Sequence, residues 1–115
     1  MQIDTAAIRS IIAARRLRDD ILGPGIGDAG WILLLELYVA YLAGRPRRIN
    51  RLVWDSDLAP ATANRWIVAL AKRGLLTRRA SPYCERGVLV ALTDEGAKRL
   101  RDYLTVAHRL SPWLA

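Results

Sequence analysis

The chain has 115 residues, of which 52% are hydrophobic and 25% charged, and its formal net charge is +7. This length suits one compact domain with a modest core, and the composition excludes a multi-domain assembly, a disordered chain and a collagen-like repeat. The excess of positive charge indicates a negatively charged partner.

The sequence also restricts the expected compartment. Cys84 is the only cysteine, which excludes an internal disulfide and favours a reducing compartment, the cytoplasm. The first residues lack the basic and then apolar layout of a secretory signal. The most apolar run, residues 31–43, contains Glu36 and is shorter than the roughly 20 residues that span a bilayer. We therefore expect no membrane segment.

The positive charge is concentrated in the middle of the chain. Residues 45–86 hold ten Lys and Arg against three Asp and Glu, a difference of seven, whereas the other 73 residues hold eight of each sign. Nine of the ten bases are arginine, whose planar group recognises phosphates and guanine edges in a bidentate way. The pattern favours a surface that binds nucleic acid, and the alternative is a solvated basic surface.

Two helices are expected before this segment. Apolar spacing predicts an amphipathic helix over residues 5–22, which the breakers Gly23 and Pro24 end. A second helix is expected over residues 29–43, with Asp28 as its cap. Because apolar residues cover nearly its whole circumference, we expect a partner subunit to bury part of it.

The basic segment begins with a helix-turn-helix pattern. We expect Ile49 to form a single strand pair and Asn50 to cap a short helix that ends near Asp57. Pro60 suits the first position of the next helix, which Gly74 ends. Two short helices joined by a tight turn fit a motif whose second helix lies in the major groove of DNA.

A hairpin and a last helix follow. Residues 75–79 and 88–92 are β-prone runs around a loop that contains Pro82 and Gly87. Thr93 is expected to cap the last helix, whose first turn contains two acidic residues. The fold class is therefore expected to be mainly α with a small β-hairpin.

This order of elements carries a family resemblance. The order of elements and three sequence motifs resemble those of the MarR-type winged-helix transcription regulators over roughly residues 29–105. The motifs are Pro60-Ala61-Thr62-Ala63-Asn64-Arg65-Trp66, Gly74-Leu75-Leu76 and Leu92-Thr93-Asp94-Glu95-Gly96. The resemblance implies a winged helix-turn-helix with extra N- and C-terminal helices for dimerisation. It also implies a homodimer on a pseudo-palindromic operator, with recognition helices in the major groove, wings against the minor groove, and no catalysis.

We expect one winged helix-turn-helix domain over residues 1–115. It divides into an N-terminal helix and linker (1–28), the MarR-like core (29–105) and the end of the C-terminal helix with its tail (106–115). Three features depart from the family pattern. The wing has Cys84-Glu85-Arg86 where relatives often have Asp-x-Arg, Asp57 stands where a turn glycine is common, and the chain ends soon after Leu110.

The expected DNA contacts follow from the helical period. On the second helix of the motif, Asn64 and Arg65 point away from the apolar face, so they are predicted to read adenine and guanine, each worth about 1–3 kcal/mol of discrimination. Thr62 is expected to meet a phosphate or a thymine methyl, and Arg86 to enter the minor groove. Phosphate contacts are expected from Arg47 and from other bases that flank the motif or lie at the hairpin. The predicted DNA-binding residues are Thr62, Asn64, Arg65, Lys72, Arg78, Arg79, Arg86, Arg48 and Arg51.

The start of the second helix is a further candidate. Ala59 has no side-chain oxygen with which to cap the helix, so its first amides are available to a DNA phosphate. The alternative is that Asp57 supplies the cap.

Other side chains receive less specific predictions. Trp54 and Trp66 are expected to pack in the core, with a base-stacking platform as the alternative for each. Trp31 and Trp113 suit a dimer interface or an effector pocket. Cys84 is expected to be a plain thiol, with a redox switch as the alternative. His108 has no companion ligands at metal-binding spacing, and no catalytic constellation is present in the sequence. We therefore expect no enzyme activity, no metal and no cofactor.

The sequence thus predicts a cytoplasmic, homodimeric, sequence-specific regulator of transcription that binds double-stranded DNA, with repression as the expected effect. Two alternatives stay open at this point. One is a winged helix that mediates protein interaction without binding DNA. The other is a redox- or ligand-gated sensor with an aromatic pocket near Trp31, Tyr38 and Tyr41 that takes a small apolar effector.

Overall fold

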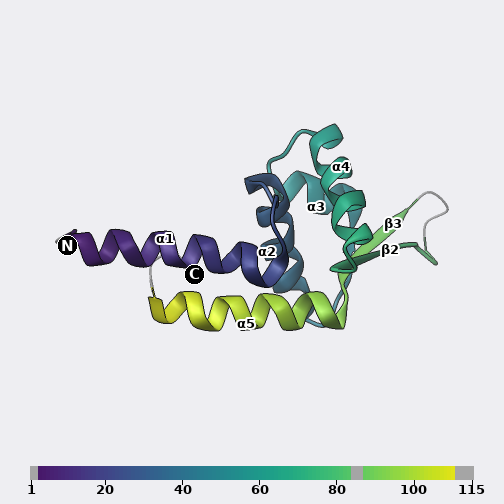
Figure 1. The fold of residues 1–115 in the computed structure, drawn as a ribbon. Coiled ribbons are helices and arrows are strands. Elements are labelled where there is room, and N and C mark those ends of the chain that lie inside the picture. Colours follow the sequence, from purple (N-terminus) through teal and green to yellow (C-terminus); the bar gives the residue numbers. More distant parts are fainter. Residues whose placement is uncertain (1–2, 84–86, 111–115) are drawn as a thin grey trace. The chain divides into compact units, whose positions relative to one another are not determined.

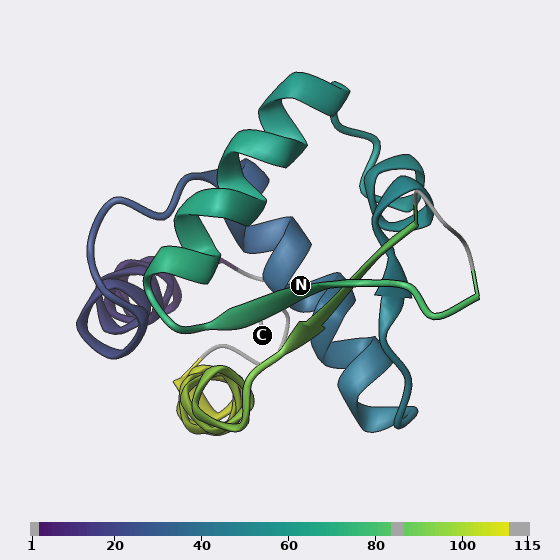
Figure 2. The same cartoon turned by 90° about the vertical axis from the view of Figure 1, so that its right-hand side faces the viewer.

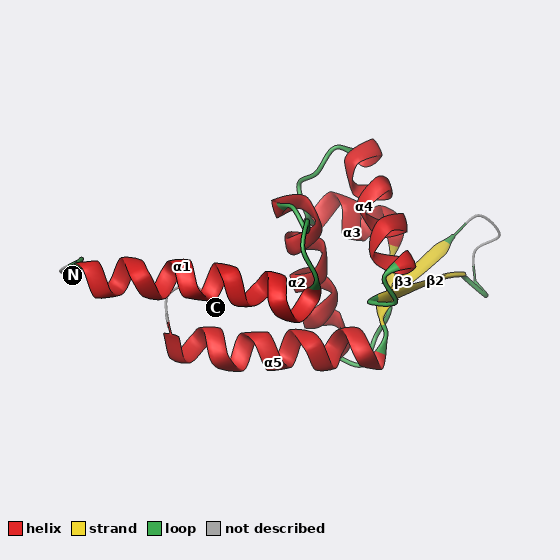
Figure 3. Cartoon of the chain, in the orientation of Figure 1, coloured by secondary structure: helices red, strands yellow, loops and turns green. Residues whose placement is uncertain are grey.

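The computed structural model describes residues 3–83 and 87–110 and confirms the expected fold class. It contains five helices and a three-stranded antiparallel sheet in these residues (Figures 1 and 3). Residues 27–97 form one compact unit, and α1 with most of α5 belongs to a second. No helix in the described residues is both long and apolar enough to cross a membrane. In chain order the elements are α1 (Thr5–Leu22), α2 (Asp28–Leu42), β1 (Arg47–Arg48), α3 (Ile49–Asp55), α4 (Pro60–Lys72), β2 (Leu76–Ala80), β3 (Val88–Leu92) and α5 (Asp94–Leu110).

The unit of α1 and α5 consists of two amphipathic helices. The Asp4 carboxylate accepts a hydrogen bond from the Ala7 amide at 2.8 Å and so caps α1. The predicted bounds of α1 are confirmed. In α5, Leu100, Tyr103 and Ala107 are buried at intervals of three and four residues. Burial raises the pKa of the Tyr103 phenol above its usual value, against the opposing effect of nearby Arg18 and Arg15.

The unit of residues 27–97 is built around β3, the middle strand of the sheet. The strand order is β1-β3-β2, and both pairs are antiparallel. Helix α2 packs against α4 and β3, and Figure 2 shows α4 above the hairpin strands and α3 beyond β1. The fully buried side chains of this unit include Leu33, Leu34, Leu37, Leu52, Ile67, Leu70, Leu75 and Val90.

Two predicted helix starts were wrong, that of α2 by one residue and that of α3 by two, and Ile49, predicted to form a strand pair, is the first residue of α3. Gly27 is the cap of α2, and Asp28 is its first helical residue. The strand before α3 consists of Arg47 and Arg48, which pair with β3, so Arg48 stays extended and occupies the cap position that we had predicted for Asn50. Pairing with the sheet thus overrides the side-chain capping signal.

Helix α2 leaves part of its apolar surface in water. Leu33, Leu34 and Leu37 are fully buried, whereas Val39 is 64% exposed and Leu42 is 70% exposed. Exposed apolar side chains next to one another are typical of a surface that another subunit covers. This exposure agrees with the prediction that a partner subunit covers part of α2, which stays a prediction.

The local signals around α4 are confirmed. Pro60 is at its first turn, and Asp57 in the preceding turn has φ +55°, a conformation that Asp adopts more readily than most residues. After α4, Gly74 has φ +76°, and the Leu75 amide donates to the Leu70 carbonyl at 3.1 Å. This is a glycine C-cap.

The end of α4 and the start of α5 meet at the base of the hairpin. The Thr93 hydroxyl donates to the Gly74 carbonyl at 2.7 Å and accepts from the Gly96 amide at 2.9 Å, which confirms Thr93 as the cap of α5. The Thr93 amide also donates to the Leu75 carbonyl at 3.0 Å. A Cβ atom on Gly96 would lie 2.1 Å from that carbonyl oxygen. Only glycine fits at this position.

We predict that Gly96→Ala lowers the free energy of unfolding by at least about 2 kcal/mol, because the new methyl group must displace the Leu75 backbone. Urea denaturation followed by circular dichroism measures the change. Gly44→Ala is the matched control: Gly44 has φ +72° with open space around it, so that variant should lose only about 1–2 kcal/mol from its backbone conformation. Equal losses in the two variants would contradict the close approach at Gly96.

Candidate nucleic-acid interface

Helix α4 separates an apolar face from a polar one. Its buried residues are Ala63, Ile67 and Leu70, as the helical period predicts. Asn64 and Arg65 are exposed on the other side. Of the remaining predicted contacts on this helix, Lys72 is exposed and Thr62 is half-buried. The helix therefore presents an amide and a guanidinium at adjacent positions, with the chemistry that reads adenine and guanine edges.

The start of α4 has no side-chain cap from the described part of the chain, as the prediction that its first amides are available to a DNA phosphate requires. Ala59 is the cap residue, and no side chain in the described residues caps the helix. Asp57 therefore does not supply the cap. Residues 59–61 are exposed, so the uncapped amides in the first turn of α4 and the positive end of its dipole are open to solvent.

Arg47 does not have the role predicted for it. Its guanidinium forms ion pairs with Glu36 of α2, at 3.5 Å, and with Asp55 of α3, and only 20% of its side chain is exposed. We had expected a phosphate contact. The pairing with Glu36 and Asp55 makes Arg47 a link between α2, β1 and α3 instead, and its charge is largely neutralised there.

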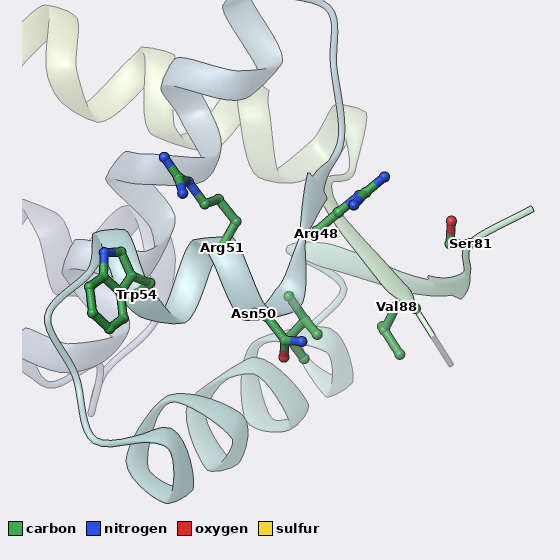
Figure 4. Close-up of a pocket in the computed structure, with 8 residues that line it drawn as sticks. Arg48, Asn50, Arg51, Trp54, Ser81 and Val88 are labelled. Atoms are coloured by element: carbon green, nitrogen blue, oxygen red, sulfur yellow. The ribbon is translucent and has the colours of Figure 1, made fainter. Parts of the chain in front are cut away.

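Arg48 and Arg51 lie around a hollow between α3 and the hairpin. The hollow has a volume of about 460 Å³. Figure 4 shows its two walls, one from β1 and α3 and the other from Ser81 and Val88 of the hairpin. The Arg51 side chain is 71% exposed, and its Nε atom lies 3.7 Å from the Asp55 carboxylate. Such an exposed pair is worth little and leaves Arg51 available to a phosphate. The residues that line this first hollow are Arg48, Ile49, Asn50, Arg51, Trp54, Ser81, Gly87 and Val88.

The two arginines of β2 are exposed but leave the strand in opposite directions. Arg78 pairs with Val90 and Arg79 with Leu89, and successive residues of a strand point to opposite faces of the sheet. Arg79 lines another hollow, of about 340 Å³, together with Tyr41 and Arg45. The predicted basic residues thus lie in three places: on α4, around the first hollow, and around the hollow that Arg79 lines.

Trp54 was predicted to pack in the core, and that prediction was wrong. Its side chain is 80% exposed and lines the first hollow. A second hollow of about 750 Å³ lies between α3 and α4, and Trp54 lines it together with Asn50 and Asn64. The short helix α3 buries only Leu52, so the apolar run of residues 52–54 gave no period from which the exposed position could be read. Trp66 is half-buried and lies against Gly27.

Some predictions concern residues that the structure does not describe. Cys84, Arg86 and Trp113 lie outside the described residues, and so does the departure from the family's wing pattern. Of the aromatic residues proposed for an effector pocket, Tyr38 and Tyr41 are stacked with ring centroids 6.3 Å apart. The Tyr41 hydroxyl donates to the Asp94 carboxylate at 3.4 Å.

Solved structures of known proteins share this architecture. A probable transcriptional regulator from Pseudomonas aeruginosa is 26% identical with a TM-score of 0.65, and the match covers 90% of this chain and 74% of that one. MepR of S. aureus, solved as a DNA complex, is 14% identical with a TM-score of 0.77, and the match covers 90% and 80%. A variant of MarR from E. coli, solved with operator DNA, is 23% identical with a TM-score of 0.65, and the match covers 90% and 72%. No family model matches the sequence, and no curated protein does.

Helices α3 and α4, the three-stranded sheet and the flanking helices define a winged-helix protein. MepR and MarR share this winged-helix fold, so the resemblance predicted from the sequence is confirmed at the level of the fold.

We predict that Arg47→Met lowers the free energy of unfolding by about 1–2 kcal/mol, because Glu36 and Asp55 lose their shared cation in a partly buried place. Thermal unfolding measured by calorimetry tests this. The control is Arg48→Met, one residue further on, where the exposed side chain should contribute less than about 0.5 kcal/mol. If the two variants are equally stable, Arg47 does not link α2 to α3.

Proposed function

We propose that the protein is a sequence-specific regulator of transcription that binds double-stranded DNA as a homodimer and acts as a repressor. The observation that carries this proposal is the outer face of α4, where exposed Asn64 and Arg65 lie beside a helix start without a side-chain cap. The same fold occurs in two neighbours that were solved with DNA. DNA in the cell is then the partner, which fits the cytoplasmic location expected from the sequence.

Each proposed DNA contact follows from the chemistry of the side chain that makes it. Asn64 and Arg65 read base edges in the major groove, with Thr62 at the same helix start. Lys72, Arg48 and Arg51 bind backbone phosphates, which fix the register of the protein on the duplex. Arg78 and Arg79 leave opposite faces of the sheet, so the one on the face toward the duplex adds a further phosphate contact. Arg86 remains proposed for the minor groove on the basis of sequence alone.

The proposed dimer brings two recognition helices to one operator. The exposed apolar residues of α2, including Val39 and Leu42, and those of α1 and α5 supply surface for a second copy. In the functional dimer, the two copies of α4 should lie about 34–36 Å apart, one turn of B-DNA, so that both enter the major groove on one side of the duplex.

We expect a selection of genomic or random duplex fragments on the purified protein to enrich one pseudo-palindromic sequence. Arg65→Ala should weaken binding to that sequence by about 1–3 kcal/mol and relax its preference at one base pair in each half-site. Fluorescence anisotropy with single base substitutions measures both effects. Arg73→Ala is the control, because it removes an equal charge from the other end of α4 and should leave the base preference unchanged. If neither Asn64→Ala nor Arg65→Ala alters affinity or preference, α4 is not the reading helix.

Sedimentation at micromolar concentration should give a dimer without DNA. Val39→Glu together with Leu42→Glu should shift the species toward monomer, because charges introduced in an apolar interface repel across a two-fold axis. The same variant should lose affinity for the whole operator far more than for a half-site. A wild-type protein that sediments as a monomer would overturn the proposed mode of binding.

A further inference from the structure

Trp54 is a large apolar side chain that the unit of residues 27–97 leaves in water. The side chain is 80% exposed, whereas Leu52, two residues earlier on α3, is fully buried. The neighbouring α4 likewise buries Ile67 and Leu70 completely. The packing of α3 therefore does not require a tryptophan at this position, and its indole is available to a partner.

Trp54 lies about one helical turn after two polar residues of α3. Asn50 and Arg51 precede it by four and three residues, the spacing that places side chains next to one another on a helix. With Arg48 they line the first hollow, and Figure 4 shows the side chains of Arg48 and Arg51 projecting away from that of Asn50. The described residues that line this hollow include two arginines and neither Asp nor Glu, which suits an anionic occupant.

The second hollow joins Trp54 to the recognition helix. Its lining includes Asn50 and Trp54 from α3 and Asn64 from α4, together with Asp55 and Asp57. The two carboxylates disfavour a phosphate on this side, whereas Asn64 is one of the proposed base-reading residues. Trp54 thus stands between a hollow suited to phosphates and the part of α4 proposed to read bases.

We propose that Trp54 is a DNA-contacting residue that packs its indole ring against a deoxyribose of the duplex backbone, with Arg48 and Arg51 on the neighbouring phosphates. This inference rests on the proposed function and adds a non-ionic contact to it. The ring offers apolar area to the sugar, and its Nε1–H group is a donor, which matches an acceptor oxygen of a phosphate. Stacking on a base is not the contact, because bases of an intact duplex are paired and stacked on each other, whereas aromatic platforms bind single strands.

The test compares Trp54→Ala and Arg51→Ala on the selected duplex over a range of salt concentrations. Trp54→Ala should raise Kd about tenfold and leave the slope of log Kd against log salt unchanged, because it removes no charge. Arg51→Ala should reduce the magnitude of that slope by about 1, since it removes one phosphate contact. Trp54→Phe is the matched variant: it keeps an apolar ring without the N–H donor and should recover most of the affinity. Both substitutions are at an exposed position, and unchanged melting temperatures would show that the fold is kept.

A second measurement follows the indole directly. The emission of Trp54 is the difference between the wild type and Trp54→Phe, and acrylamide should quench it strongly in the free protein. Duplex DNA should protect it, while the Arg65→Ala variant at saturating DNA should show the same protection.

The outcomes separate this inference from the proposed function. If the wild type binds the duplex but Trp54→Ala binds equally well, or Trp54 stays open to acrylamide in the complex, the Trp54 contact is overturned and DNA binding stands. If Trp54→Ala changes sedimentation rather than Kd, Trp54 belongs to a protein interface, and the contact is again overturned. If single-stranded DNA binds more tightly than the duplex through Trp54, the backbone contact is wrong. If the wild type binds no duplex, both proposals fail.

Discussion

The carbonyl groups of Gly74 and Leu75 hold the end of α4, the hairpin and the start of α5 together. Thr93 donates to both carbonyls, through its hydroxyl at 2.7 Å and its amide at 3.0 Å. Gly96 has no side chain, and a Cβ atom added there would lie 2.1 Å from the Leu75 oxygen, so the first turn of α5 packs directly against this carbonyl group. The orientation of the recognition helix relative to β2 depends on this junction, because α4 passes into β2 through only three residues.

The parts of the fold that the sequence predicts well are those set by single residues with local effects. Pro60 begins α4, Gly74 ends it and Thr93 caps α5, and each acts through its own backbone or one hydrogen bond. The start of α3 was less predictable, because Arg47 and Arg48 are held extended by pairing with β3, about 40 residues later in the chain. Local capping signals carry no information about such a strand partner.

The candidate site shows the same division. Asn64 and Arg65 could be predicted as exposed because α4 has thirteen residues and a clear apolar period. Trp54 could not, since α3 has only seven residues and its apolar run fits more than one face. Nor does any spacing in the sequence reveal that Arg47 lies between Glu36 and Asp55. The count of arginines thus locates a basic region, but it does not show which of these charges are available to bind DNA.

Glu36, Arg47 and Asp55 form a chain of charges from α2 to α3. Helix α2 has the exposed Val39 and Leu42, while α3 has Arg51 and Trp54, so one guanidinium connects the surface proposed for subunit association with the surface proposed for the duplex. The ion pair with Glu36, at 3.5 Å, is the one that joins Arg47 to α2. Because carboxylates of α2 and α3 share Arg47, the electrostatic potential beside α3 depends on Glu36 as well as on Asp55.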